Sequence, residues 1–232
     1  MRVHYESLPG SVKGFARYMP GGGLWRYNAI LRLMPTLLTE VPQIPLPPIP
    51  PRKRWTREQC APLEASGLFE QERLELVDGE LIAKMGKNRP HVKAFTWMHL
   101  WLLETFGRQF VNAEAPIDVS PGDNSWNEPE PDLIVLKRKF ATFDSNPQPQ
   151  DLDLVVEIAD STLKFDLTVK AVLYARAAIA EYWVLDVAGK RLIVHRSPVS
   201  GTYTSVAAYG ENEIIAPLAA PKARFRPSEV LA

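Results

Sequence analysis

Two short apolar segments, each with one carboxylate, constrain the fold of this chain most strongly. Residues 133–136 (Leu-Ile-Val-Leu) follow Asp132, and residues 154–159 contain Glu157. Both segments are apolar on both faces, which is typical of central strands in a buried sheet. An ionised carboxylate in such a setting is unfavourable by roughly several kcal/mol unless something pairs with it. A divalent cation between the two acids is the best explanation, and oxygen-only ligation favours Mg²⁺, with Mn²⁺ as a substitute.

The composition is that of an ordinary globular protein and excludes several kinds of site. The chain has 232 residues, 46% hydrophobic and 23% charged, which suffices for one sizeable domain and an appendage. The single cysteine, Cys60, excludes a disulfide framework and a thiolate metal site, and it favours a cytoplasmic location. No apolar run reaches the roughly 18 residues of a membrane span. We expect neither membrane association nor an organic cofactor.

The formal net charge is zero, so any surface that binds phosphate must be local. Three basic patches are candidates, although such patches are more often simply solvated faces. They comprise Arg52-Lys53-Arg54 with Arg57, then Lys84, Lys87, Arg89 and Lys93, and then Lys137-Arg138-Lys139.

Residues 1–51 differ in character from the rest of the chain. Three consecutive glycines at 21–23 precede a proline-dense stretch that favours extended polyproline II. We expect a poorly ordered tail or linker here, followed by a folded domain over 52–232. A docking site for a proline-recognising partner and a later translation start at Met34 are alternatives.

The remaining pattern predicts an α/β fold, a mixed β-sheet flanked by helices. Helical spacing over 165–180 predicts that Leu167, Ala171, Tyr174 and Ala178 face the sheet. The predicted elements are a helix over 57–66 capped by Thr56, a hairpin over 73–83 around Asp78-Gly79, a helix over 90–106 ended by Gly107, strands over 111–119, 132–136 and 154–159, a helix over 165–180, a strand over 182–185, and a hairpin of 192–195 with 203–207.

The connection between the two acidic strands allows them to lie side by side, with both carboxylates at one end. Strand periodicity places Val155, Glu157 and Ala159 on one face. Lys170 lies beside the apolar stripe of its helix, so we expect it to lean towards the sheet and the metal. A salt bridge to Asp166, four residues earlier, is the structural alternative.

Two further residues are candidates for the same site. Glu75 lies in a strand-like segment just before the Asp78-Gly79 turn, where it is either an accessory acid or a solvent-facing residue. His91 opens the helix over 90–106 and could cap it or contact a phosphate or a water.

This constellation resembles the putative restriction endonuclease family (Uma-two) of the PD-(D/E)XK nuclease superfamily. The resemblance runs from about Trp55 to the C-terminus. It implies a restriction-endonuclease-like fold and a metal-dependent hydrolase of DNA phosphodiester bonds, with Asp132 and Glu157 as metal ligands and Glu75 as an accessory acid. The residues that carry it are Glu75-Leu76-Val77-Asp78-Gly79-Glu80, His91, Glu130-Pro131-Asp132, Leu154-Val155-Val156-Glu157-Ile158, Asp166, Lys170, Tyr174 and Glu181-Tyr182-Trp183-Val184-Leu185-Asp186.

One departure from the family pattern matters for function. The lysine that usually follows the second acid by two residues is replaced by Ala159, and Lys170 is the expected substitute. The alternative is a degenerate nuclease fold that serves as a nucleic-acid-binding or protein-interaction module. A two-carboxylate glycosidase fits less well, because these acids lie in short buried strands. A homodimer is expected, because cutting both strands of DNA needs two active sites.

Overall fold

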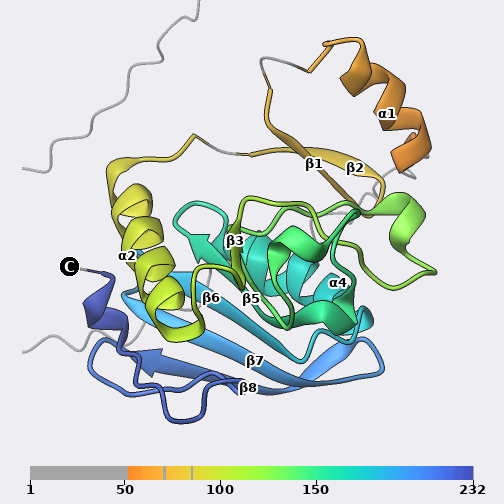
Figure 1. Cartoon of the computed structure of the whole chain (residues 1–232). Helices are drawn as coiled ribbons and strands as arrows, with labels where there is room; N and C mark the ends of the chain where they lie inside the picture. The colour runs from red at the N-terminus through yellow and green to blue at the C-terminus, as the bar shows by residue number, and fades with distance from the viewer. Residues whose placement is uncertain (1–51, 70–71, 85, 232) are drawn as a thin grey trace, which may run out of the picture. The chain divides into compact units, whose positions relative to one another are not determined.

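The fold centres on a six-stranded mixed sheet (Figure 1). The computed structural model describes residues 52–69, 72–84 and 86–231, so the predicted tail over 1–51 lies outside the described residues. Neighbouring strands are antiparallel except for the parallel pair β5 and β6. This arrangement confirms the predicted α/β fold with a mixed sheet. The strand order is β3 (Val111–Ala113), β4 (Leu133–Leu136), β5 (Leu152–Ala159), β6 (Glu181–Asp186), β7 (Arg191–Val199) and β8 (Thr202–Gly210).

Helices cover both faces of this sheet and divide the core into two clusters. On one face, α2 (Arg89–Phe106) inserts Met98 and Leu102. On the other face lie α3 (Leu163–Phe165), η4 (Asp166–Lys170) and α4 (Ala171–Arg176), and here Tyr174 is fully buried. The layers are therefore helix, sheet and helix (Figure 1).

Strand β5 runs through the middle of the sheet and contributes to both clusters. Val155 and Ala159 join the cluster of α4, whereas Leu154, Val156 and Ile158 join that of α2. This alternation confirms the predicted periodicity and fixes the face on which Glu157 lies. Because both faces of β5 are buried, a shift of its pairing register by one residue would move each set of side chains to the opposite face of the sheet.

A second, two-stranded sheet pairs β1 (Leu74–Val77) with β2 (Glu80–Ala83). Asp78 and Gly79 both have positive φ, 47° and 80°, as the tight turn predicted from the Asp-Gly dipeptide requires. The helix α1 (Arg57–Ala65) begins at its predicted cap, Thr56, whose hydroxyl accepts the Gln59 N–H. Short 3-10 turns lie in the connections: η1 (Asn124–Trp126), η2 (Phe140–Thr142), η3 (Pro149–Asp151) and η5 (Pro227–Glu229).

Some predicted elements were wrong in extent. The strands β7 and β8 extend several residues beyond the hairpin predicted over 192–195 and 203–207. The strand predicted over 111–119 ends at Ala113, because Glu114 takes a left-handed backbone with φ 50°. The helix predicted over 165–180 begins at Leu163, contains a π-helical turn and ends at Arg176. Ala178 therefore does not face the sheet: it is exposed, with φ 57°.

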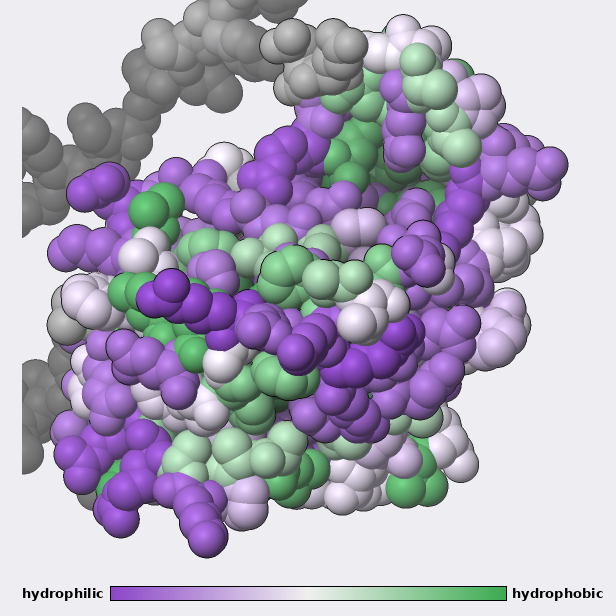
Figure 2. Space-filling view, viewed as in Figure 1, coloured by the Kyte–Doolittle hydropathy of each residue, from purple (hydrophilic) through white to green (hydrophobic). Residues whose placement is uncertain are grey.

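Hydrophilic side chains cover most of the face seen in Figure 2, and the hydrophobic patches on it are small. Within the described ranges, no helix combines the length and the apolar character needed to cross a membrane.

The burial of α2 predicts very different effects for two of its leucines. Leu102 is fully buried, whereas Leu100 is 42% exposed. Leu102→Ala should lower the free energy of unfolding by about 2–5 kcal/mol, because it leaves a cavity beneath the helix. Leu100→Ala, the matched control, should change it by no more than about 0.5 kcal/mol. Urea unfolding followed by circular dichroism measures both, and equal losses would contradict this packing.

Candidate active site

Asp132 and Glu157 lie side by side on neighbouring strands. Asp132 immediately precedes β4, whose Leu133 pairs with Val156 of the antiparallel β5. The Asp132 N–H donates to Oε2 of Glu157 (3.3 Å), and the Ile158 N–H donates to Oδ2 of Asp132 (2.8 Å). Each carboxylate is thus held by the other's strand, so their relative position follows from the register of the sheet.

Lys170 lies in the helical layer that packs on the sheet, and its side chain points towards Asp132 and Glu157 on the strands, as its position in the sequence predicted. Its Nζ lies 2.8 Å from Oε1 of Glu157 and 3.0 Å from Oε1 of Glu75, and all three side chains are about 95% buried. The structural alternative, an ion pair with Asp166, is not formed. The Tyr174 hydroxyl donates to the same Glu157 oxygen at 3.1 Å.

Lys170 and Asp166 both lie in the π-helical turn η4, and both are buried. Such turns widen a helix locally and are frequent at functional sites. Both residues line the same pocket as Asp132 and Glu157. Oδ2 of Asp166 accepts a hydrogen bond from the Thr162 hydroxyl at 2.6 Å.

Glu75 joins the small sheet to this site. It lies on β1, and its Oε2 accepts the Glu130 N–H at 3.2 Å while its Oε1 pairs with Lys170. The solvent-facing alternative was wrong, because Glu75 is only 6% exposed. The reason is that β1 docks on the segment before Asp132, through a bridge between Leu76 and Glu128.

His91 lies at the start of α2 and faces Asp132. Its Nε2 is 3.7 Å from Oδ2 of Asp132, and its Nδ1 is buried with no hydrogen-bond partner among the described residues. The expectation that His91 caps the helix was wrong: the cap is Asn88, whose side chain accepts the His91 N–H at 3.0 Å. A contact of His91 with phosphate or water stays a prediction.

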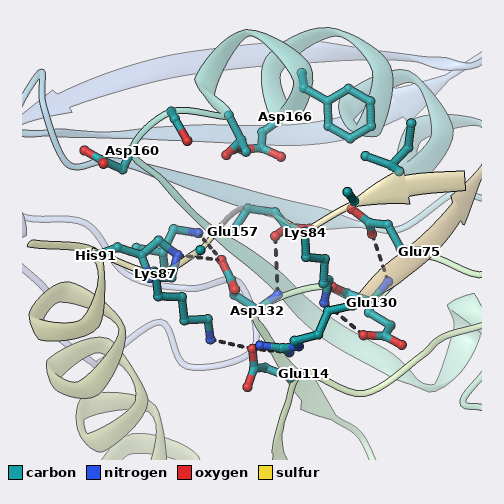
Figure 3. A pocket seen from close by; sticks show the side chains of 18 of the residues that line it. Glu75, Lys84, Lys87, His91, Glu114, Glu130, Asp132, Glu157, Asp160 and Asp166 are labelled. Atoms are coloured by element: carbon teal, nitrogen blue, oxygen red, sulfur yellow. Dashed lines mark hydrogen bonds and ion pairs between the residues drawn. The ribbon is translucent and has the colours of Figure 1, made fainter. Parts of the chain in front are cut away.

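Several residues that line the pocket complete its charge distribution (Figure 3). Lys84 donates to the side chain and the carbonyl of Glu130, both at 2.9 Å. Lys84 and Lys87 belong to a basic patch noted in the sequence. Glu114 and Asp160 were missed, because Glu114 fell inside a predicted strand and Asp160 in an unassigned turn.

The buried carboxylates strongly affect one another. Burial raises the pKa of Glu157 to about 8; Lys170 opposes this shift, and nearby Asp132 adds to it. Burial likewise raises the pKa of Asp166 to about 6. Burial alone would lower the pKa of Lys170, but Glu157 and Glu75 outweigh it and raise the pKa. Four acids surround one ammonium, which leaves a local excess of negative charge.

A buried acid elsewhere in the fold provides a contrast. Glu181, at the start of β6, is fully buried, yet it accepts hydrogen bonds from Arg196, the Trp183 indole and the Leu218 N–H. Its charge is therefore satisfied by partners that lie outside the pocket. Asp132 and Glu157 also accept hydrogen bonds, but they share the single Lys170 ammonium with two further acids and they line an open pocket.

A small oxygen-binding cation suits this donor set. Among the residues that the structure describes, no three His, Cys, Asp or Glu side chains are placed to hold a metal ion together. Mg²⁺ does not need three, because it binds through one or two carboxylates and completes its octahedral shell with water and phosphate oxygens. Asp132 and Glu157 supply two adjacent carboxylates next to an open pocket.

The comparisons with known proteins agree with this fold. The family model described as "putative restriction endonuclease" (Uma2) matches residues 58–227. The mixed sheet with its flanking helices is a restriction-endonuclease-like α/β fold. The chain belongs to the putative restriction endonuclease family. No curated protein matches it in sequence.

A solved structure shares the fold. It is described as a "putative nuclease belonging to DUF820" from Anabaena variabilis ATCC 29413. The TM-score is 0.55 at 14% sequence identity, and the match covers 69% of this chain and 90% of that chain. At this identity the likeness shows the fold alone.

The two ion pairs of Lys170 predict a large effect on stability. Lys170→Met leaves the carboxylates of Glu75 and Glu157 without their partner, so each must stay charged in the core or take up a proton. At pH 9, above the pKa of Glu157, the free energy of unfolding should therefore fall by about 3–5 kcal/mol. Adding Glu157→Gln should restore part of this loss, because one uncompensated charge is removed. Urea unfolding in EDTA measures both variants. A loss below about 1 kcal/mol, or no recovery in the double variant, would contradict the ion pairs.

Proposed function

We propose that this protein is a metal-dependent endonuclease that hydrolyses phosphodiester bonds of DNA. The observation that carries the proposal is the position of Lys170 against Glu157, with Asp132 on the neighbouring strand. Two acids and one lysine meet here from a strand start, a strand interior and a helix. Membership in the putative restriction endonuclease family supports the same activity.

Asp132 and Glu157 would hold Mg²⁺ or Mn²⁺. When bound, such an ion polarises the scissile phosphate and lowers the pKa of a coordinated water. The hydrogen bonds across β4 and β5 keep both carboxylates in place, so little reorganisation is needed at the site.

Lys170 is placed to act on the phosphate or on the attacking water. An ammonium has three donors, and Glu157 and Glu75 take two of them. The third donor remains for a phosphate oxygen or a water in the pocket. Lys170 would thus supply the positive charge that Ala159 lacks. Glu75 would be an accessory residue that fixes the direction of the lysine.

His91 would hold Asp132 from the opposite side. Its Nε2 faces Oδ2 of Asp132, and the side chain is 13% exposed at the edge of the pocket. In this position it restricts the rotation of the carboxylate, which favours one orientation towards the metal.

Cleavage of DNA tests this proposal. The full chain, incubated with supercoiled and linear DNA, should nick it in Mg²⁺ or Mn²⁺ and not in EDTA. Asp132→Asn and Glu157→Gln should each lower the rate at least about 100-fold, because each removes a charged ligand. Gel electrophoresis over a time course measures the rates.

The matched control is Asp153→Asn, which alters a carboxylate on the same strand outside the pocket. It should cleave at the rate of the unchanged protein. Full activity in Asp132→Asn would refute the assignment. DNA binding by the unchanged protein with no response to metal and no cleavage would favour the alternative, a binding module. The homodimer stays a prediction, which sedimentation of the full chain tests.

A further inference from the structure

Glu114 has an unusual backbone beside the proposed metal ligand. It follows β3 directly and adopts φ 50°, a left-handed conformation that is unfavourable for a residue other than glycine. Its N–H donates to the carbonyl oxygen of Asp132 at 3.0 Å. The two residues are therefore opposite one another across β3 and β4. This fixed position brings the Glu114 side chain to the wall of the pocket.

Two cations converge on one oxygen of this carboxylate. Arg73 donates to Oε1 of Glu114 at 2.7 Å. Lys87 donates to the same oxygen, and Figure 3 shows Lys87 next to Glu114. The Lys87 ammonium also lies 4.3 Å from the centre of the Phe95 ring. Arg73 lies just before β1 and Lys87 in the segment between β2 and α2, so the fold brings them together. All three charged side chains line the pocket.

Stability gives little reason for this arrangement. Arg73 is 54%, Glu114 30% and Lys87 25% exposed, and ion pairs that solvent reaches contribute little to folding. The left-handed backbone of Glu114 is itself unfavourable. By contrast, Lys84 is only 14% exposed and is held by both the side chain and the carbonyl of Glu130, which gives it a structural role before Asp132.

The geometry suits an oxyanion other than a carboxylate. An arginine and a lysine that share one oxygen are a common way to bind a phosphate, whose oxygens accept several charged hydrogen bonds. We propose that Arg73 and Lys87 form a phosphate subsite next to the proposed metal site. Glu114 occupies this subsite until a phosphate of the nucleic-acid backbone displaces it. This inference rests on the proposed function, because it assigns a neighbouring phosphate of the same substrate.

The subsite would favour nucleic acid over small anions as well as add to the affinity for nucleic acid. A free cationic subsite would bind any small anion, whereas Glu114 must first be displaced. A polyanion that also contacts other residues of the protein through its further phosphates can offset that displacement, but an isolated anion cannot. Removing the carboxylate should therefore strengthen binding of DNA, the opposite of what a substitution in a binding pocket usually does.

Binding of a fluorescein-labelled 20-base-pair duplex to the full chain tests this inference. Anisotropy titrations in EDTA at 50–200 mM salt give the Kd and its salt dependence without cleavage. Glu114→Gln should lower the Kd about three- to tenfold. The slope of log Kd against log salt concentration should become steeper by about 1–2, about one for each side chain, Arg73 and Lys87, that is freed to contact a phosphate. Adding Arg73→Gln and Lys87→Gln to Glu114→Gln should abolish this gain.

The matched control is Glu211→Gln, which removes the acid of an exposed pair with Lys190 (3.2 Å) outside the pocket. It has the same change in net charge and should leave the Kd within about twofold. If Glu114→Gln binds no more tightly than the control while the unchanged protein cleaves in Mg²⁺, the subsite is wrong and the nuclease stands. If the unchanged protein neither cleaves nor binds, and no variant binds, both proposals fail.

Discussion

The buried contact of Lys170 with Glu157 and Glu75 is the interaction on which the rest of the structure depends. It joins three parts of the fold: the helical layer, the central strand β5 and the small hairpin. A buried ion pair is rarely the most stable solution for a core, since well-packed apolar residues often do better. Its presence in the middle of this fold therefore indicates a use for the charges rather than a need for stability.

Much of the candidate site could be predicted because its key residues are charged while the segments around them are apolar. Asp132 and Glu157 stand out as charges beside or within apolar strands, and strand periodicity gave the face of Glu157 correctly. Lys170 could be placed towards the sheet because it lies beside an apolar stripe of helical spacing. In each case a local pattern of period 2 or 3.6 was sufficient. The family resemblance then connected residues that the chain separates widely.

The remainder depends on backbone geometry that such patterns do not encode. Val111 to Val119 contains enough apolar residues to suggest one strand, yet Glu114 interrupts it with a left-handed turn. The π-helical turn that begins at Asp166 could not be predicted either, because the apolar pattern was interpreted with the α-helical period of 3.6 residues. Asn88, rather than His91, caps α2 because the helix begins at Arg89. These departures cluster around the pocket, where folded proteins often sacrifice local regularity for function.

The exchange of hydrogen bonds between Asp132 and the strand of Glu157 also has a consequence for the folding chain. Each acid is held by hydrogen bonds from the neighbouring strand rather than from its own segment. Lys170 reaches them only when the helical layer of α3, η4 and α4 has packed on the sheet. A partly folded chain, or one with slipped strands, would therefore hold these residues apart. Under the proposed function, cleavage of a phosphodiester bond would therefore be possible only once the fold is complete, and a chain still being folded would carry no active site.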